Sequence, residues 1–378
     1  IAADEGVMPQ TREHMEICQL LRVKKGLVVL TKIDMVEDPD WIEMVQEDVA
    51  QFLKGTFLEG SPILPVSAVT GDGIPELKEA LTRLVETVEA RSPEGPFRLS
   101  VDRVFTMKGF GTVVTGTSTA GKLHVGDPVM IYPPGHKTKV RGLQVHGQEV
   151  EEVLPGRRTA INLQSIERAI IQRGDVVATP GSLVATHMVD VYLDLLKSAP
   201  RPLKHRAKVR FHTGTAEHLG TVILLDREEL LPAESAFVQI RLDHPVAALR
   251  GDRFVLRSYS PVQTVGGGTI LHPLPRKHKG HDKREAAVAL KTLLDGAETD
   301  IILWHILDAG WTGLTEHELQ VRANVSPKLL EKALQRFISQ KQVILYDKEN
   351  RKLLHPDSME QLKQAIVETG RASCRESG

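Results

Sequence analysis

The tetrapeptide Thr31-Lys32-Ile33-Asp34 places a carboxylate where a sheet could present it to a ligand. It follows a short apolar run, residues 26–30, and precedes a stretch with helical spacing. A carboxylate held there can accept hydrogen bonds from the ring N–H and the exocyclic amine of guanine. Adenine does not offer this pair of donors, and a site whose polar group is left unpaired rejects the wrong ligand strongly. The alternative is an ordinary strand end with a coincidental Lys-x-Asp.

A second turn, Ser67-Ala68-Val69-Thr70-Gly71, follows the apolar run 63–66 and also precedes a helical pattern. A backbone N–H of this turn could donate to the guanine carbonyl; alternatively, the turn only caps the helix that begins near Gly73. Two such turns at the ends of parallel strands meet in the crevice where open α/β sheets bind ligands. Together they resemble the guanine-reading motifs of GTPases. The candidate nucleotide-binding residues are Thr31, Lys32, Asp34, Ser67 and Ala68.

Motifs for the phosphates of a nucleotide are absent from the sequence. It contains no Gly-x-x-x-x-Gly-Lys-Ser/Thr, and no Asp-x-x-Gly precedes residue 31. The groups that stabilise charge during phosphoryl transfer are therefore missing. We predict that this chain neither hydrolyses GTP nor binds it tightly, and we assign it no catalytic residue. The chain opens without Met on Ile1-Ala2-Ala3-Asp4, which is typical of the end of a buried strand, so we expect an N-terminal truncation with the catalytic residues upstream.

The elements that must position these residues change along the chain. Strand and helix signals alternate over 1–90, as in the C-terminal half of a parallel α/β GTPase domain. After a linker rich in Pro and Gly, residues 97–182 and 183–275 contain short Val- and Ile-rich runs broken by Gly, which predicts two successive β-barrels. Residues 280–369 return to helical spacing and add a hairpin, which predicts a winged helix. Residues 370–378 lack periodicity and are interpreted as a non-native tail.

Individual elements follow from the same periodicity. Helices are predicted over 10–21, 40–54, 75–89, 283–294, 300–307, 315–323 and 326–339, and a further helix begins near Met359. Asp40 is the predicted N-cap of the second of these helices. Gly266-Gly267-Gly268 is interpreted as a bulge or a tight turn, since no Lys-Ser/Thr follows it.

Length, charge balance and cysteine count exclude several classes of protein. A chain of 378 residues suits two to four domains. With 48 basic and 49 acidic residues, it has no overall attraction to nucleic acid, so any RNA contact must come from local patches. Its two cysteines, Cys18 and Cys374, exclude a disulfide scaffold and fit a reducing compartment. No apolar run approaches the length of a membrane span.

Longer motifs resemble translational GTPases. Residues 3–14, Ala-Asp-Glu-Gly-Val-Met-Pro-Gln-Thr-Arg-Glu-His, are similar to the segment after the switch II strand of elongation factors. Residues 105–116, Phe-Thr-Met-Lys-Gly-Phe-Gly-Thr-Val-Val-Thr-Gly, and 251–257 resemble the signatures of their second and third domains. The order of units over about 1–272 matches elongation factor Tu and its relatives. This resemblance implies GTP as a cofactor, with Mg²⁺ in the full-length protein.

Within that class, three features resemble the bacterial selenocysteine-specific elongation factors. In that family the residues that match Asp102, Arg103 and Arg158 line the pocket for the esterified amino acid. A selenol is ionised at neutral pH, and two guanidiniums would favour the selenolate over the neutral hydroxyl of serine. The alternative is a surface ion pair on a barrel rim. The other two features are residues 258–268 and the winged helix, which elongation factor Tu lacks.

The resemblance implies GTP-dependent delivery of selenocysteinyl-tRNA to the ribosome at UGA codons. It also implies an mRNA hairpin as a partner of winged helices that lie mostly beyond this chain, and a cytoplasmic monomer without a membrane partner. Lys328, Lys332 and Arg336 are a candidate phosphate-facing stripe, the alternative being a solvated helix face. Three other functions stay open: a general elongation factor Tu-like factor, the GTPase of sulfate adenylyltransferase, and a winged-helix DNA-binding regulator.

Overall fold

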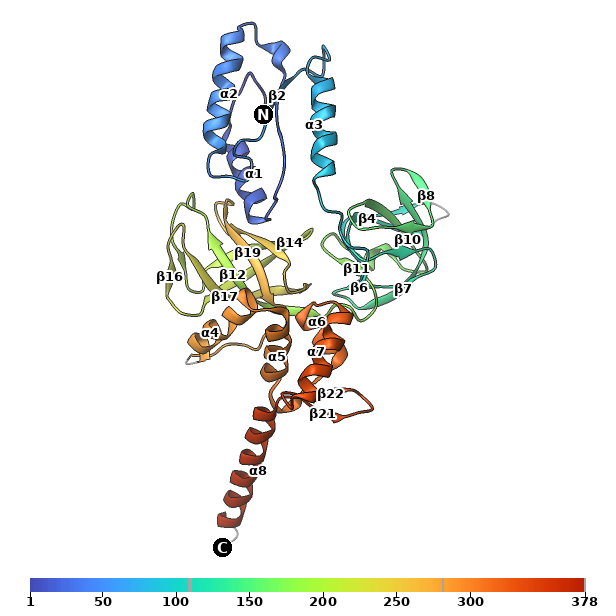
Figure 1. Ribbon diagram of the computed structural model, residues 1–378, viewed down its shortest axis with the longest axis vertical. Helices are drawn as coiled ribbons and strands as arrows, with labels where there is room; N and C mark the ends of the chain where they lie inside the picture. Colours follow the sequence, from blue (N-terminus) through green and yellow to red (C-terminus); the bar gives the residue numbers. More distant parts are fainter. Residues whose placement is uncertain (108–110, 281, 377–378) are drawn as a thin grey trace.

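The computed structural model describes residues 1–107, 111–280 and 282–376, and Figure 1 shows their arrangement. A small α/β unit lies above two β-barrels, and a mainly helical unit lies below the second barrel and ends in the long helix α8 (Pro356–Glu376). None of the helices in the described ranges has both the length and the apolar character needed to cross a membrane. Of the motif at 105–116, residues 108–110 lie outside the described residues.

The α/β unit is built on parallel strands. Strand β1 (Val28–Thr31) pairs in parallel with β2 (Ile63–Val66), and Ala2 forms a parallel bridge to Thr31. Its helices are α1 (Pro9–Leu20), α2 (Pro39–Leu53) and α3 (Ile74–Glu86). Alternate residues of β1 are buried against the apolar face of α2, which includes Val45 and Val49. The predicted parallel α/β arrangement is confirmed.

The N-terminal cap of α2 differs from the prediction. Asp38 caps this helix, because its Oδ1 accepts a hydrogen bond of 3.0 Å from the backbone N–H of Asp40. Pro39 then occupies the first helical position, where a missing N–H leaves no hydrogen bond unmade. The prediction of Asp40 as the cap was therefore wrong by two residues, since it placed Pro39 before the helix.

The first barrel is closed by six strands in the order β10-β4-β3-β11-β6-β7, with β10 also paired to β7. The strands are β3 (Arg98–Met107), β4 (Gly111–Ala120), β6 (Pro128–Tyr132), β7 (His136–Val145), β10 (Arg158–Leu163) and β11 (Val176–Ala178). Strand β8 (Gln148–Val150) pairs with the end of β7 as an antiparallel hairpin, and β5 (Leu123–His124) pairs with β9 (Glu152–Val153). Residues along β10 are alternately buried and partly exposed, which is the period expected of a barrel wall.

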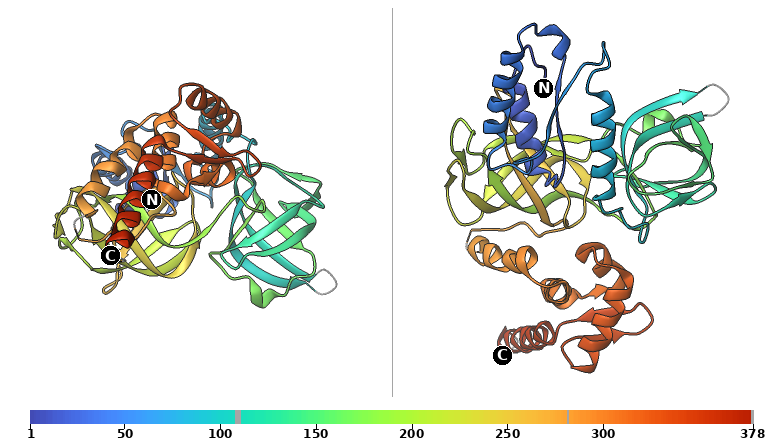
Figure 2. Two further views of the ribbon diagram at one scale, coloured as in Figure 1. Left: turned by 90° about the horizontal axis from the view of Figure 1, so that it is seen from below. Right: turned by 45° about the horizontal axis from the view of Figure 1, so that its top comes forward.

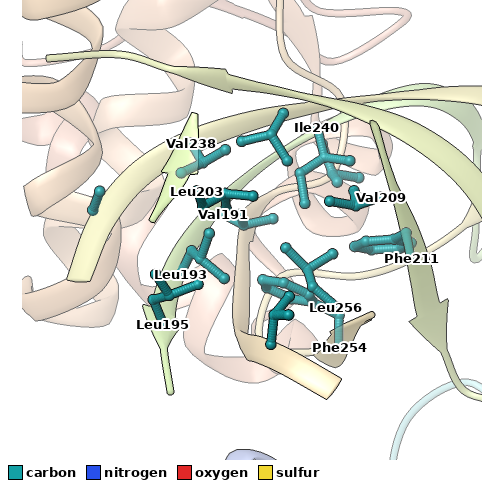
Figure 3. Close-up of a cluster of buried hydrophobic side chains, with 14 of the residues drawn as sticks. Val191, Leu193, Leu195, Leu203, Val209, Phe211, Val238, Ile240, Phe254 and Leu256 are labelled. Atoms are coloured by element: carbon teal, nitrogen blue, oxygen red, sulfur yellow. The ribbon is translucent and has the colours of Figure 1, made fainter. Parts of the chain in front are cut away.

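The second barrel is closed by six strands in the order β12-β17-β15-β14-β18-β19. They are β12 (Ala185–Leu195), β14 (Lys208–Thr213), β15 (Ala216–Leu224), β17 (Ser235–Ala247), β18 (Arg253–Ser258) and β19 (Thr264–His272), and a small pair joins β13 (Leu203–Lys204) to β16 (Glu229–Leu230). Figure 3 shows side chains from these strands, among them Val191, Phe211 and Leu256, filling the interior. Both barrels agree with the predicted fold class.

The three consecutive glycines form no turn. Gly266–Gly268 lie within extended β19, and a Cβ on Gly268 would stand 1.9 Å from the backbone oxygen of Tyr192. Neighbouring strands approach too closely for any side chain there, which is why glycine is needed. Leu256 pairs with Gly266 and Arg257 with Thr264, so β19 has one extra residue, Val265, directly before the glycines. Of the two predicted interpretations, the tight turn was wrong, and a bulge lies beside Gly266 rather than at the three glycines.

The C-terminal unit agrees with the predicted winged helix. It contains α5 (Glu298–Asp308), β20 (Leu314–Thr315), α6 (Glu316–Ala323), α7 (Pro327–Ser339), β21 (Ile344–Asp347) and β22 (Lys352–Leu354), with strand order β20-β22-β21. Strand β20 was not predicted, because two residues cannot display a period of two. Helix α4 (Asp282–Asp295) lies between this unit and the second barrel, and Leu271 of the barrel shares one apolar cluster with Leu290 of α4 and Ile302 of α5.

Candidate functional site

The two turns predicted to read a base meet at the carboxyl ends of β1 and β2. The hydroxyl of Ser67 donates a hydrogen bond of 2.5 Å to Oδ1 of Asp34, although the two residues are 33 positions apart. The same hydroxyl oxygen accepts from the backbone N–H groups of Val69 (3.2 Å) and Thr70 (3.1 Å). Ser67 is fully buried, whereas Asp34 is exposed. Ser67 therefore fixes both the turn and the position of the carboxylate that faces solvent.

Thr31 and Lys32 have different surroundings. The hydroxyl of Thr31 donates to the carbonyl of Ile1 at 3.2 Å, so it joins β1 to the N-terminal residues that bridge to this strand. Lys32 adopts a left-handed backbone conformation with φ of 60° just before the 3₁₀ turn Ile33–Met35. Its ammonium lies 3.8 Å from the Asp4 carboxylate, and its side chain is half exposed. Lys32 and Asp34 are both exposed, so a planar ligand can reach them although each has a partner, whereas the Thr31 hydroxyl is used within the α/β unit.

The turn that contains Ala68 is not a helix cap. Helix α3 has Gly73 as its N-cap, without any side-chain hydrogen bond. Gly73 has φ of 71°, and a Cβ there would lie 2.0 Å from the backbone oxygen of Pro65. In the part of the chain that the structure describes, the backbone N–H groups of Val69 and Thr70 bond the Ser67 hydroxyl, whereas that of Ala68 donates no hydrogen bond. An unpaired N–H beside an exposed carboxylate fits the base end of a guanine nucleotide.

The predicted aminoacyl pocket lies on the first barrel. Strand β3 has a register shift between Val101 and Arg103, so Asp102 sits at an irregularity of the barrel wall. Arg158, at the start of β10, forms two hydrogen bonds with the Asp102 carboxylate, one from Nη1 to Oδ2 and one of 3.1 Å from Nη2 to Oδ1. Thr115 Oγ1 donates to the same Oδ1 at 2.8 Å. The structure therefore brings Asp102 and Arg158 together from positions 56 residues apart.

The charges of Asp102, Arg103 and Arg158 do not cancel. Burial raises the pKa of Asp102, but hydrogen bonds from Arg158 and Thr115 and the positive charges of Arg158 and Arg103 outweigh burial and hold that pKa below its ordinary value. The hydrogen bond with Asp102 raises the pKa of Arg158. Two guanidiniums and one carboxylate leave a single net positive charge. The Arg158 side chain is 54% exposed, so it can reach a ligand while it holds Asp102.

Some residues that position the site carried no recognised signal in the sequence. Arg98 of the first barrel and Asp252 of the second form a bidentate ion pair with two contacts of 2.7 Å. Glu13 of α1 accepts hydrogen bonds from Arg257 and Thr264 of the second barrel. Only the match of residues 3–14 and 251–257 to elongation-factor motifs marked Glu13, Asp252 and Arg257, and it gave no partner for them.

The stripe predicted on the winged helix is exposed. Lys328, Lys332 and Arg336 lie on the outer face of α7, opposite the buried residues Leu330, Ala333, Leu334 and Phe337. Their placement is compatible with phosphate contacts and equally with a solvated face. Their role stays a prediction.

Three family models match consecutive parts of the chain. The elongation factor Tu GTP binding domain matches residues 1–87, and elongation factor Tu domain 2 matches residues 111–178. The β-barrel domain of the selenocysteine-specific elongation factor matches residues 189–277. These matches follow the order of the α/β unit, the first barrel and the second barrel.

Relatives and solved structures are similar over more of the chain. A selenocysteine-specific elongation factor from Desulfomicrobium baculatum is 47% identical over 368 residues, which are 97% of this chain and 58% of the relative. One from Haemophilus influenzae (strain ATCC 51907 / DSM 11121 / KW20 / Rd) is 30% identical over 80% of this chain and 48% of its own length. The chain therefore spans about half the length of the curated relatives it matches.

The crystal structure of a bacterial selenocysteine-specific elongation factor, EF-Sec, superposes with a TM-score of 0.80 at 27% identity, over 98% of this chain and 58% of that one. The apo crystal structure of the translation elongation factor SelB from Methanococcus maripaludis gives a TM-score of 0.64 at 27% identity, over 71% and 63% of the two chains. The first likeness extends over almost the whole of this chain.

Proposed function

Since the chain belongs to the selenocysteine-specific elongation factors, which are translational GTPases, we propose that it acts in the GTP-dependent delivery of selenocysteinyl-tRNA to the ribosome at UGA codons. The GTPase activity is proposed for a full-length protein that carries the phosphate-binding motifs missing from these 378 residues. GTP would hold the α/β unit and the barrels around the acceptor end of the tRNA, and hydrolysis on the ribosome would release it.

The pairing of Arg158 with Asp102, beside Arg103, carries this proposal. A selenocysteinyl ester presents a selenolate at neutral pH, and a seryl ester presents a neutral hydroxyl. The net positive charge of the three side chains suits one anion, and hydrogen bonds to a charged group are worth about 1.5–3 kcal/mol. Asp102 keeps Arg158 oriented before the ligand arrives, so the order needed for recognition is already present. A neutral hydroxyl would gain little from the same groups.

The base of GTP is proposed to bind between Asp34 and Ala68. Asp34 would accept from the guanine ring N–H and amine, and the Ala68 N–H would donate to the guanine carbonyl. Lys32 would cover the face of the base. Mg²⁺ and the phosphates would be held by residues that this sequence does not contain. We therefore propose that the 378-residue chain binds GTP weakly, and a nucleotide titration that gives micromolar or tighter affinity would overturn this statement.

The remaining assignments rest on the same family. We propose four domains at 1–90, 97–182, 183–275 and 280–369, a cytoplasmic monomer, and an mRNA hairpin as a partner of winged helices. A DNA-binding regulator is the alternative from another class, and it would show a sequence preference for duplex DNA in a filter-binding assay. A general elongation factor or a sulfate adenylyltransferase GTPase would bind no selenolate, so neither alternative explains the two guanidiniums of Arg103 and Arg158 beside Asp102.

The direct test compares two esters on one tRNA body. A full-length protein with GTP should protect selenocysteinyl-tRNA from ester hydrolysis better than seryl-tRNA. Equal protection of the two esters would contradict the assigned substrate and would reduce the proposal to general tRNA delivery.

A further inference from the structure

The linker between β19 and α4, together with the first residues of α4, is strongly basic. Residues 276–284 contain the cations Arg276, Lys277, Lys279, Lys283 and Arg284, and their only carboxylate is Asp282. Arg276 pairs with Asp308 of α5 at 3.1 Å. The right-hand view of Figure 2 shows this linker running along the lower edge of the second barrel to α4. Most of this positive charge therefore lies where the second barrel meets α4.

The backbone of the linker is fixed to the barrel. Nη2 of Arg241 donates to the carbonyl of His278 at 3.2 Å, and Nε2 of Gln239 donates to the carbonyl of Arg276 at 2.8 Å. The ring of His278 contacts the fully buried Asp190 carboxylate at 2.6 Å. Three anchors within three residues give the neighbouring lysines defined positions. Order of this kind lowers the entropy cost of binding an anion.

A cavity of about 540 Å³ opens at the same joint. It is lined by the loop 224–228 after β15 and by Gly280, Lys283 and Arg284. The ammonium of Lys283 lies 3.3 Å from Nε2 of His205, a contact that requires the neutral imidazole. Burial, and then the positive charge of Lys283, lowers the pKa of His205; the negative charge of Glu228 opposes this, and the charges of Arg206 and Arg241 lower the pKa further. Positive charge at this joint is thus in excess.

The cationic strip is defined as Arg206, Lys277, Lys279, Lys283 and Arg284. In the ranges that the structure describes, none of its five members takes part in an ion pair with a carboxylate. Four of them are exposed and Lys283 is half-buried. The carboxylates that line the cavity belong to Asp226, which bonds Arg227, and to Glu228. Cations spread along a linker match a chain of phosphates better than they match a single anion.

We infer that the cationic strip binds the phosphate backbone of an RNA at the joint between the second barrel and α4. The choice of RNA rests on the proposed function, whereas the attraction for phosphates rests on the strip itself. Such contacts position an RNA without reading its sequence. They also release counterions, so the binding constant falls steeply as salt rises.

The probe is a tRNA transcript without an aminoacyl group, titrated with the 378-residue chain in the absence of nucleotide. The variant Lys277→Gln/Lys279→Gln removes two exposed charges, and Lys78→Gln/Lys137→Gln removes two exposed charges elsewhere as a matched control. Each lost phosphate contact makes the slope of log K against log salt shallower by about 0.7–0.9. We expect the slope of log K against log salt to be shallower by about 1.5 in the strip variant than in the wild-type protein, and unchanged in the control variant.

Two results would overturn the inference. One is a strip variant whose slope and affinity match those of the control variant. The other is displacement of the RNA by inorganic phosphate beyond the effect of chloride at equal ionic strength, which would indicate a site for a small anion. The titration contains no ester and no GTP, so its result does not depend on whether Asp102, Arg103 and Arg158 bind a selenolate. Conversely, the selectivity between the two esters does not depend on whether the cationic strip binds RNA.

Discussion

Arg257 of strand β18 donates a hydrogen bond of 3.0 Å to the carboxylate of Glu13 on α1, and the two residues lie 244 positions apart in the sequence. Thr264 adds a hydroxyl donor to the same carboxylate oxygen at 2.7 Å. Leu20 of the same helix lies against Gly267 of β19, where a Cβ would meet it at 3.1 Å. Two hydrogen bonds to Glu13 and an apolar contact of Leu20 therefore hold the α/β unit on the second barrel.

Replacing Glu13 by Gln should loosen that contact in a pH-dependent way. Hydrogen bonds from Thr264, with the charge and hydrogen bond of Arg257, hold the pKa of Glu13 below its ordinary value. A depressed folded-state pKa gives stability that is present above the unfolded value of 4.5 and is lost as the pH falls through the folded value. We expect Glu13→Gln to cost about 1 kcal/mol at neutral pH, the usual size of one such hydrogen bond.

The measurement is the unfolding temperature against pH, with Glu16→Gln on the same helix as the control. The wild-type protein and the control should lose stability below pH 4.5 more steeply than Glu13→Gln does. Parallel curves for all three proteins would show that Glu13 contributes no linked stability.

Asp175 in the first barrel should have the opposite pH dependence. It is 2% exposed, and burial raises its pKa to about 6, against an ordinary value of 3.8. A raised folded-state pKa gives stability that is complete below 3.8 and is lost as the pH rises through about 6. This loss amounts to at most about 3 kcal/mol, at 1.36 kcal/mol per pKa unit.

Asp175→Asn retains an acceptor for the Gln172 N–H, which now bonds Asp175 Oδ2 at 2.9 Å, and it cannot ionise. We expect the variant to be more stable than the wild-type protein at pH 7 and similar to it near pH 4, as measured by thermal unfolding. A variant that loses stability as steeply as the wild-type protein between these pH values would contradict the assignment of this pH dependence to Asp175.

Gly268→Ala should destabilise the second barrel strongly, because the new methyl group would stand 1.9 Å from the Tyr192 backbone oxygen. Backbone on both sides must then move, and forced overpacking costs typically about 1–3 kcal/mol. Gly142→Ala in β7 is the matched control, since nothing lies within 4 Å of its ideal Cβ. Denaturant unfolding should separate the two variants, and equal midpoints would refute the close approach at Gly268.

The parts of the fold that could be predicted are those encoded locally. Strand 63–66 forms a short apolar run in the sequence and α7 shows a clear helical period, so both elements were placed correctly, although only Val66 of that strand is buried. The pairing of Asp34 with Ser67 followed from a general rule for parallel strands, because both residues end such strands.

The parts that could not be predicted depend on distant partners. Nothing near Glu13 in the sequence indicates Arg257, and nothing near Asp175 indicates that it is buried without a counter-charge. The glycines at 266–268 are compatible with a turn or with close strands, and only the position of Tyr192 decides between them. The two-residue β20 is shorter than any repeat that a pattern can display.

We propose that Arg158, held by Asp102, selects a selenolate. The decisive measurement is the hydrolysis rate of selenocysteinyl-tRNA and seryl-tRNA bound to full-length protein with GTP, under reducing conditions, for the wild-type protein, Arg158→Ala and the neighbouring control Arg157→Ala. Loss of a charged hydrogen bond of about 1.5–3 kcal/mol predicts that Arg158→Ala lowers the preference for the selenocysteinyl ester by about ten- to a hundredfold. Arg157→Ala should keep that preference. An unchanged preference in Arg158→Ala would contradict the account and leave Arg158 and Asp102 as an ion pair on the barrel rim.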